Sequence, residues 1–272
     1  MTDINVRYLK FDVPDEIDPM VLPGEPEMSY LLVGLSMILP YLEPYLIKNN
    51  RLAQKKVTDP ELLHDMKQFC RQECQHHQQH NLVNEKVRKL YPGLAELEKE
   101  VAEDYARFTA KGLKFNVAFG EGFESLTFPV VVFMYETGMM QDMTNPLGDI
   151  YTWHFCEEVE HRNVLYDAYY ELYSDYFFRL KVSLISQFHL LQFMVRCAQV
   201  MLRQDGKEAF VKYGGWPGRM KRLWRWTKLA IKHLLPNLKQ TYLPQYSPHD
   251  IPVSPAVQTL TDSYTERAFK VS

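Results

Sequence analysis

The sequence lacks the signatures of several common protein classes. It has only 12 glycines and no GxGxxG or GxxxxGK[ST] run, which excludes the usual nucleotide-binding loops. The N-terminus, MTDINVRYLKFDVPDEIDP, is acidic and has no apolar core, so it is not typical of a secretory signal. No stretch approaches about 18 uninterrupted apolar residues, so we expect no membrane-spanning helix. The four cysteines form no disulfide-scaffold pattern. A reducing, cytoplasmic setting is therefore expected.

The sequence also shows little net charge and no clear pattern of β-strands. The net charge is −3, so overall electrostatics do not favour nucleic acid as a partner. Apolar and polar residues show no sustained alternation, and no repeat of about 20–50 residues is present. Hydrophobic residues make up 46% of the chain, enough for a substantial core. These observations predict an all-α fold in one domain.

Apolar residues instead recur at helical spacing through most of the chain. Proline and glycine mark the boundaries: Thr58-Asp59-Pro60-Glu61 begins one helix, and Pro92-Gly93 ends it. Pro40 and Pro44 should kink the first helix. The predicted helical segments are 27–46, 60–90, 94–111, 115–140, 145–172 and 177–202.

We divide the chain into three parts. Residues 1–26, with four prolines, predict an irregular N-terminal arm. Residues 27–204 predict a helical bundle. Residues 205–272 predict a basic amphipathic helix followed by a wrapping tail, with an extended segment from Tyr242 to Pro255. The tail is expected to belong to the same domain.

Two short runs each place a glutamate and a histidine three residues apart. One is Glu73 and His76 in RQECQHHQQH, and the other is Glu158 and His161 in WHFCEEVEHR. Residues three apart share a helix face, so each pair can hold a metal ion from one side. One such pair alone is more typical of a surface ion pair. Two of them match the four-helix bundles that hold two iron or manganese ions.

Such bundles also take one glutamate from each of two further helices. Glu43 in LPYLEPYL and Glu124 in GEGFESLTF are acidic residues in apolar sequence. A buried carboxylate needs a metal or a counter-charge. Glu121 lies one turn earlier and competes with Glu124. The predicted ligands of two divalent ions are Glu43, Glu73, His76, Glu124, Glu158 and His161.

The donor set indicates the type of metal. Oxygen and nitrogen donors in this ratio favour iron, with manganese or a mixed iron and manganese pair as alternatives. Six further positions lie on or beside the same helix faces, either as extra ligands or as residues that hydrogen-bond a ligand. They are His80, His154, His77, Glu121, Glu157 and His189. A histidine on an apolar face is also typical of an ordinary core residue.

The C-terminal third is basic and aromatic. Between Glu208 and Asp250 there are eight Lys and Arg residues and no acidic residue. Residues 216–239 form an amphipathic helical pattern with tryptophans, which is typical of a helix lying on an anionic membrane surface. A helix packed on the bundle with a solvated basic face fits the pattern equally well. We therefore expect a cytoplasmic protein, with peripheral contact at the inner membrane surface as an open alternative.

The two histidine motifs resemble those of a bacterial ferritin-like family described as predicted metal-dependent hydrolases. The run RQECQHHQQHN, residues 71–81, is similar to that family's RQExxHHxxHN. Residues 153–169 are similar to its WHxxEExEHRxVxxDxY, and Pro40, Glu43, Tyr45 and Arg51 match its first-helix pattern. The resemblance implies a ferritin-like four-helix bundle with accessory helices, an extended C-terminal segment and a two-metal site. At the third ligand helix, Glu124-Ser125-Leu126-Thr127 replaces the family's Glu-His-Phe-Thr, which removes a histidine.

Three functions remain as alternatives at this stage. The first, which the apolar segment 113–140 favours, is a di-iron enzyme that uses O2 to oxidise a small hydrophobic organic substrate, with an electron donor as partner. The second is a metal-dependent hydrolase that uses a metal-bound hydroxide. The third is a non-catalytic metal-binding bundle. A homodimer is compatible with each of them.

Overall fold

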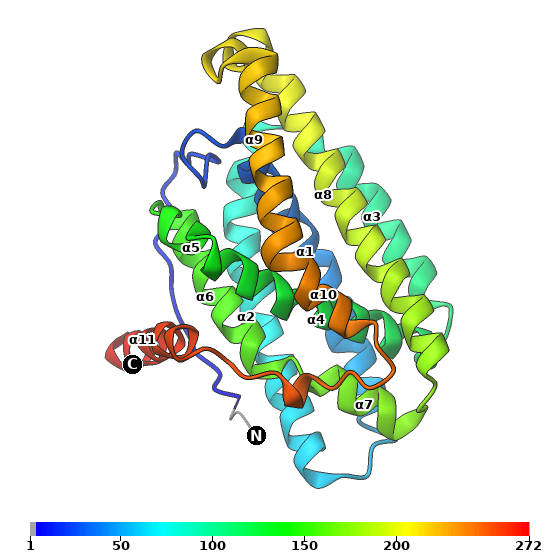
Figure 1. Cartoon of the computed structure of the whole chain (residues 1–272). Coiled ribbons are helices and arrows are strands. Elements are labelled where there is room, and N and C mark those ends of the chain that lie inside the picture. Colours follow the sequence, from blue (N-terminus) through cyan, green and yellow to red (C-terminus); the bar gives the residue numbers. More distant parts are fainter. Residues whose placement is uncertain (1–3, 272) are drawn as a thin grey trace.

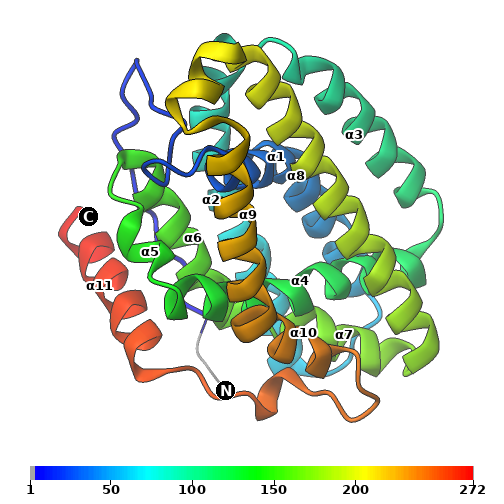
Figure 2. The same ribbon diagram turned by 45° about the horizontal axis from the view of Figure 1, so that its top comes forward.

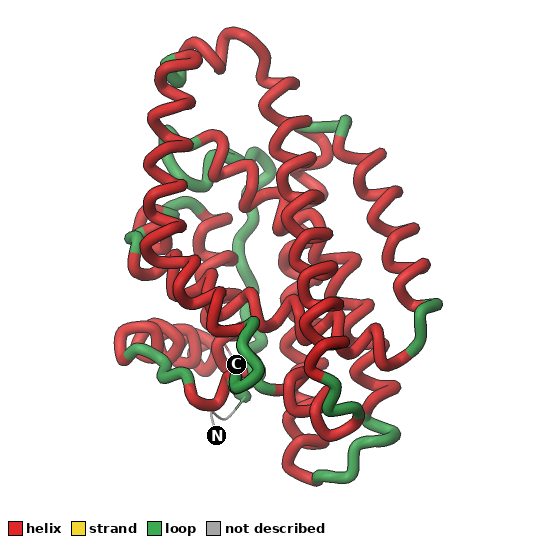
Figure 3. The backbone as a smooth tube through the Cα atoms, turned by 45° about the vertical axis from the view of Figure 1, so that its right-hand side comes forward, coloured by secondary structure: helices red, strands yellow, loops and turns green. Residues whose placement is uncertain are grey.

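The structure is a computed structural model that describes residues 4–271, with side chains described through residue 268. Over this range the chain forms helices and connecting loops and contains no strand (Figure 3). The prediction of an all-α bundle is confirmed. The elements are α1 Pro26–Ala53, α2 Pro60–Leu90, α3 Leu94–Thr109, α4 Leu113–Glu136, α5 Met139–Asp142, α6 Pro146–His161, α7 Val164–Leu172, α8 Tyr176–Lys212, α9 Gly215–Leu229, the π-helical turn η1 Ala230–Leu234, α10 Leu235–Thr241, the 3-10 turn η2 Pro248–Asp250 and α11 Pro255–Val271.

Four of the helices surround the centre of the bundle. Helix α1 packs against α2, α2 against α6, α6 against α4, and α4 back against α1, which closes the ring (Figure 1). These are the helices on which the sequence places the six predicted ligands. Helix α3 lies outside the ring, beside α1 and α8, and is an accessory helix as expected (Figure 2).

Local sequence signals fix where the ring helices begin. The Asp59 carboxylate accepts hydrogen bonds from the backbone N–H groups of Glu61 and Leu62, with Pro60 in the first turn of α2. Asn145 caps α6 in the same way, through the N–H of Gly148. These caps set the register of the two helices that carry the Glu-x-x-His pairs.

Helix α8 packs closely on the outside of the ring against α1 and α4. The approach depends on glycine. A Cβ at Gly122 would lie 2.4 Å from the Ser183 Cα, and one at Gly34 would lie 2.8 Å from the Met194 Cα. Larger residues at these positions would force the backbones apart, so the two glycines allow α8 to pack closely against α4 and α1.

Several predicted boundaries were wrong. The segment 145–172 is two helices, α6 and α7, which are separated at Arg162 and Asn163, where the Arg162 guanidinium donates to the carbonyl of Val159. The segment 115–140 is split into α4 and α5. The segment 177–202 is only the first part of α8, which continues through the non-helical Gly206 to Lys212. Helix α11 was not predicted, and it packs against α6.

The sequence predicted no membrane-spanning helix, and two of the ring helices test that prediction. Helices α1 and α4 are long and apolar enough to span a membrane by length and composition, although charged residues interrupt them. In each, 78% of the apolar window is buried inside the bundle. Such burial is what a core helix requires, and we assign both helices to the core.

Candidate metal centre

The ring helices direct seven buried side chains toward one another. Helix α1 supplies Glu43, α2 supplies Glu73 and His76, α4 supplies Glu124, and α6 supplies His154, Glu158 and His161. All seven are 4% exposed or less. The three- and four-residue spacings on α2 and α6 place those five side chains on the inner faces of their helices.

Two overlapping groups in this cluster have the spacing of a metal site. In one, potential ligand atoms of Glu73, His76, Glu158 and His161 lie within 4.8 Å of one another. In the other, Glu43, His76 and His154 do so. The groups share His76, so the arrangement offers two adjacent ion positions.

The histidine nitrogens face the carboxylates at distances that an ion would bridge. His161 Nε2 lies 3.3 Å from Glu73 Oε1 and 3.6 Å from Glu158 Oε1. His76 Nδ1 lies 3.9 Å from Glu73 Oε1 and 3.8 Å from Glu158 Oε1. Two ligands of one ion at about 2.0–2.2 Å from it stand about this far apart.

Eight polar atoms of the cluster have no hydrogen-bond partner among the described residues. This holds for both carboxylate oxygens of Glu43 and Glu73, one oxygen each of Glu124 and Glu158, His76 Nδ1 and His161 Nε2. Buried polar atoms are normally paired, because an unpaired one costs free energy. Other buried atoms in the described chain are also unpaired, but here unpaired carboxylate oxygens and imidazole nitrogens face one another, so the residues present fit a cation site.

Burial shifts the pKa values of these groups toward their neutral forms. The pKa values of Glu43, Glu73 and Glu124 are raised well above the usual range, first by burial and then by the neighbouring carboxylates. Burial also lowers the pKa of His76 well below its usual value and that of His154 to about 3. Four ionised carboxylates would be balanced by two divalent cations, and neutral imidazoles are the form that ligates metal.

A directional hydrogen-bond chain fixes the orientation of His154. Its Nδ1 lies 2.9 Å from His80 Nε2, and His80 Nδ1 lies 2.8 Å from Ser36 Oγ. The Ser36 hydroxyl donates to Asn84 Oδ1, whose amide donates back to the Ser36 carbonyl. Because the serine donates onward, it accepts from His80, and His80 in turn accepts from His154. His154 Nε2 is thereby left unprotonated, 3.7 Å from Glu43 and 2.7 Å from Glu158.

A second support holds His76. His76 Nε2 donates to Glu157 Oε2 at 2.9 Å, which leaves Nδ1 directed at Glu73 and Glu158. Glu157 also pairs with Arg7 of the N-terminal arm at 3.1 Å, and Arg7 is only 3% exposed. A carboxylate behind a ligating histidine fixes its tautomer and increases its basicity. The arm is therefore part of the site's support.

Glu124 is joined to the cluster through a histidine. Its Oε2 lies 3.2 Å from His161 Nδ1, while its Oε1 has no partner among the described residues. It belongs to neither of the two groups. The structure thus brings five of the six predicted ligands and His154 into the groups, and leaves Glu124 directly behind His161.

The remaining predicted positions lie outside the groups. Glu121 pairs with Arg179 at 2.7 Å and accepts from Ser183, and His189 faces Asp104 at 3.0 Å. His80 lies one step behind His154, as described above. His77 is partly exposed, and its Nδ1 lies 4.0 Å from Glu43 Oε2.

The cysteines show no sign of a redox role. All four are free thiols, and Cys70, Cys156 and Cys197 are buried. Burial raises the pKa of Cys156 and Cys197 to about 12 and raises that of Cys70. Thiols with raised pKa values are poor nucleophiles at neutral pH. A role in packing fits these surroundings.

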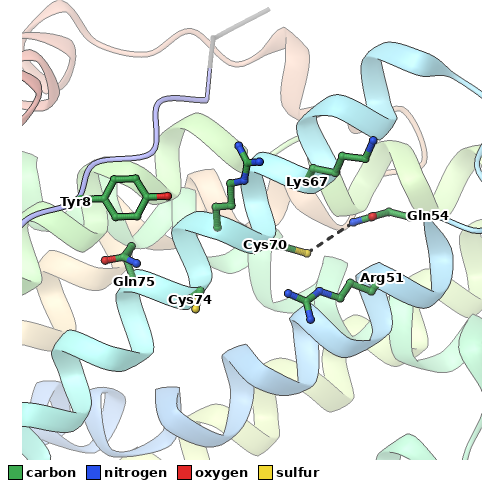
Figure 4. A pocket seen from close by; sticks show the side chains of 8 residues that line it. Tyr8, Arg51, Gln54, Lys67, Cys70, Cys74 and Gln75 are labelled. Carbon is green, nitrogen blue, oxygen red and sulfur yellow. Dashed lines mark hydrogen bonds between the residues drawn. The ribbon is translucent and has the colours of Figure 1, made fainter.

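A solvent-facing pocket lies on the outer side of α2, close in sequence to the first motif (Figure 4). Its volume is about 320 Å³. The lining residues are Tyr8, Arg51, Gln54, Lys67, Cys70, Arg71, Cys74 and Gln75. None of them belongs to the two groups, so this pocket is separate from the metal centre.

The sequence did not reveal the supporting residues Arg7 and Ser36. Arg7 lies 150 residues from Glu157 in the chain, within an arm expected to be irregular. Ser36 lies 44 residues from His80. No local pattern in the sequence signals such contacts.

Comparison with known proteins gives one match. A family model described as "Predicted metal-dependent hydrolase" matches residues 5–251. No curated protein and no solved structure matches the chain. Of the reactions considered from the sequence, this match supports metal-dependent hydrolysis better than O2-dependent oxidation.

Proposed function

The chain belongs to the predicted metal-dependent hydrolase family, and on this premise we propose that it is a hydrolase with a two-metal centre inside the bundle. The observation that carries the proposal is the set of buried, unpaired ligand atoms from four helices. Glu73, His76, Glu158 and His161 would hold one ion. Glu43 and His154 would hold the second, since the one unprotonated nitrogen of His76 can ligate only one ion.

When bound, divalent ions supply Lewis acidity, which polarises a carbonyl or phosphoryl oxygen and lowers the pKa of water toward neutrality. The chain's own residues prepare the site for this. The Ser36–His80–His154 chain and the Arg7–Glu157–His76 chain hold two imidazoles in the orientations that ligation requires. Glu124 supports His161 in the same manner.

The surroundings favour an apolar part of the substrate. The Phe69 ring packs edge-on against His161 at 4.8 Å, and the Trp153 ring against His76 at 5.0 Å. Both rings are fully buried. Apolar walls exclude bulk water and strengthen electrostatic interactions inside the site. We therefore propose a small hydrophobic ester, amide or phosphoester as substrate class.

His77 connects the centre with solvent. Its side chain is 22% exposed, whereas that of neighbouring Glu43 is 1% exposed. Burial lowers the pKa of His77, so the neutral form prevails near pH 7. Its Nδ1 donates to the backbone carbonyl of Glu73 at 2.9 Å, so the nitrogen nearest Glu43 already carries a proton. We therefore place His77 at the solvent side of the centre and assign it no proton transfer.

Oxidation with O2 is the second candidate. The specific observation in its favour is the carboxylate-rich donor set enclosed by aromatic rings, which suits iron better than zinc. In that case the centre would hold iron and need an external electron donor. The hydrolytic assignment stands first because of the family match.

One experiment separates the two. The purified protein would be reconstituted with Fe2+, Mn2+ or Zn2+ and offered p-nitrophenyl esters and phosphoesters with and without O2. Hydrolysis predicts turnover without O2 and one ¹⁸O atom from labelled water in the product. Turnover that requires O2, with ¹⁸O taken from the gas, would establish oxidation and overturn the proposal. The metal-free protein serves as the blank.

A further inference from the structure

Exposed apolar side chains are concentrated in one part of the molecule. Among the residues that the structure describes, all but four of the large exposed hydrophobic side chains lie between Phe177 and Leu243. The exceptions are Tyr8, Leu52, Leu82 and Leu90. This part consists of α8, α9, η1 and α10, and α8 and α9 lie side by side (Figures 1 and 2). We call it the α8–α10 face.

The same segment carries a strong positive charge. Residues 177–243 contain 13 Lys and Arg against two acidic residues, a net charge of +11. The whole chain has a net charge of −3, so the remaining residues carry −14. Such an asymmetry creates a local positive potential that selects a negatively charged partner.

Helix α9 and the following turn η1 present an apolar stripe to solvent. Trp216, Met220, Trp224 and Ile231 follow at four- and seven-residue spacing and are 65%, 57%, 61% and 59% exposed. No residue of α9 is buried. A core-packed helix would turn these side chains inward, because burying each would stabilise the fold by about 1.5–3 kcal/mol.

Basic residues on α9 and on the elements next to it, from Lys212 to Lys239, divide into two sets. The arginines bind the bundle: Arg222 pairs with Glu27 at 2.7 Å, and Arg225 pairs with Glu25 at 2.6 Å. The lysines have no carboxylate partner among residues 4–268. They are Lys212, Lys221, Lys228, Lys232 and Lys239. The arginines thus fix the helix, and the lysines remain available to an external anion.

A groove beside α9 adds a pocket for an anionic group. Its volume is about 480 Å³. The lining residues are Gly24, Glu25, Gly218, Lys221, Arg222, Trp224, Arg225 and Lys228. Lys228 Nζ lies 4.9 Å above the Trp224 ring. A cationic groove next to an exposed tryptophan joins the two features that an interfacial membrane helix combines.

We propose that the α8–α10 face docks on an anionic lipid bilayer, with the α9 stripe in the headgroup and acyl boundary and the lysines on lipid phosphates. A second copy of the chain fits less well, because two faces that each carry these unpaired lysines would repel each other. The proposal concerns a surface away from the metal centre and does not depend on the reaction catalysed there.

The test is vesicle binding by the full-length protein. The protein should float with phosphatidylglycerol-containing vesicles and stay behind with pure phosphatidylcholine, and added salt should release it. Brominated acyl chains should quench the fluorescence of Trp216 and Trp224. Combined Lys221→Glu, Lys228→Glu and Lys232→Glu substitutions should weaken partitioning on the order of 100-fold, at about fivefold for each lysine.

The matched control changes net charge equally elsewhere. Lys55→Glu, Lys56→Glu and Lys99→Glu alter exposed lysines outside the face, and this variant should retain most of the binding. Equal loss in both triple variants, or no binding at low salt, would overturn the proposal. A stable dimer in sedimentation velocity that shields Trp224 and ignores vesicles would replace it with self-association. Circular dichroism and metal content verify that each variant is folded.

Discussion

The metal centre and the α8–α10 face depart from ordinary burial in opposite directions. In the centre, carboxylates such as Glu43 and Glu73 are fully enclosed and unpaired among the described residues. On the face, Trp216 and Trp224 stand in solvent. Folding alone favours neither arrangement, since it would pair or expose the carboxylates and bury the tryptophans. Each region therefore indicates a partner of complementary chemistry, a cation inside and an anionic apolar surface outside.

The largest effect is expected from Glu158→Ala. Glu158 lies 3.8 Å from His76 Nδ1 and 3.6 Å from His161 Nε2, at the middle of the first group. The variant should lose about half of its metal. Its turnover should fall by about 10³-fold, since each ion stabilises the transition state by several kcal/mol. Metal analysis and the hydrolysis assay measure both. The exposed Glu85→Ala on α2 should change neither, and full metal retention in Glu158→Ala would refute the ligand assignment.

Removal of the metal should destabilise the bundle, whereas lipid binding at the α8–α10 face should leave this effect unchanged. A ligand present at a thousandfold excess over its Kd stabilises the native state by about 4 kcal/mol. For a chain of this size, a chelator should then lower Tm by about 10 °C. Calorimetry with and without chelator measures the shift. An unchanged Tm would mean that the unpaired carboxylates are not a metal site, whereas vesicles should leave the chelator shift unaltered.

Substitution of Glu157 tests whether this carboxylate orients His76 or only helps to hold Arg7 and the arm in place. Glu157 and Glu160 both pair with Arg7, but Glu157 also accepts from His76. Glu157→Gln should weaken metal affinity by about 10–100-fold. Glu160→Gln should weaken it far less. A competition titration with a chromophoric chelator measures the affinities. Equal losses would show that Arg7 holds the arm without orienting the histidine.

The metal-free protein should become less stable as pH rises above about 6.5. A carboxyl whose folded pKa is raised contributes stability below its unfolded pKa and loses it as pH rises through the folded value. Glu43, Glu73 and Glu124 all have raised pKa values. The lowered pKa values of His76 and His154 act oppositely, but only below about 6.5, the unfolded histidine value. The loss should be about 1.4 kcal/mol per pH unit for each proton released.

Denaturant titrations between pH 6.5 and 9 measure this trend. The metal-loaded protein should show little of it, because bound cations favour the ionised carboxylates. If the metal-free and metal-loaded proteins respond to pH alike, the carboxylates do not titrate within the folded bundle.

The two regions also differ in how far the sequence predicts them. Glu73 and His76, like Glu158 and His161, lie three residues apart, and helical periodicity alone places them together. The contacts of Arg7 and Ser36 depend on how distant segments pack, which no local pattern encodes. The break after His161 went unpredicted because neither proline nor glycine marks it. For α9, the pattern was visible, but the sequence could not show which side of the helix faces the bundle.

The smallest effect is expected from Trp224→Ala, and it tests whether the face serves folding at all. Trp224 is 61% exposed, so its loss should change the free energy of unfolding by no more than about 0.5 kcal/mol. Trp153→Ala is the matched substitution in the other region; Trp153 is 0% exposed and packs on His76, so this change should cost about 3–5 kcal/mol. Urea titrations of the metal-free variants measure both. A cost at Trp224 approaching that at Trp153 would mean that α9 uses this side chain to stabilise the fold, and the contrast between a buried polar centre and a surface kept apolar for a partner would fail.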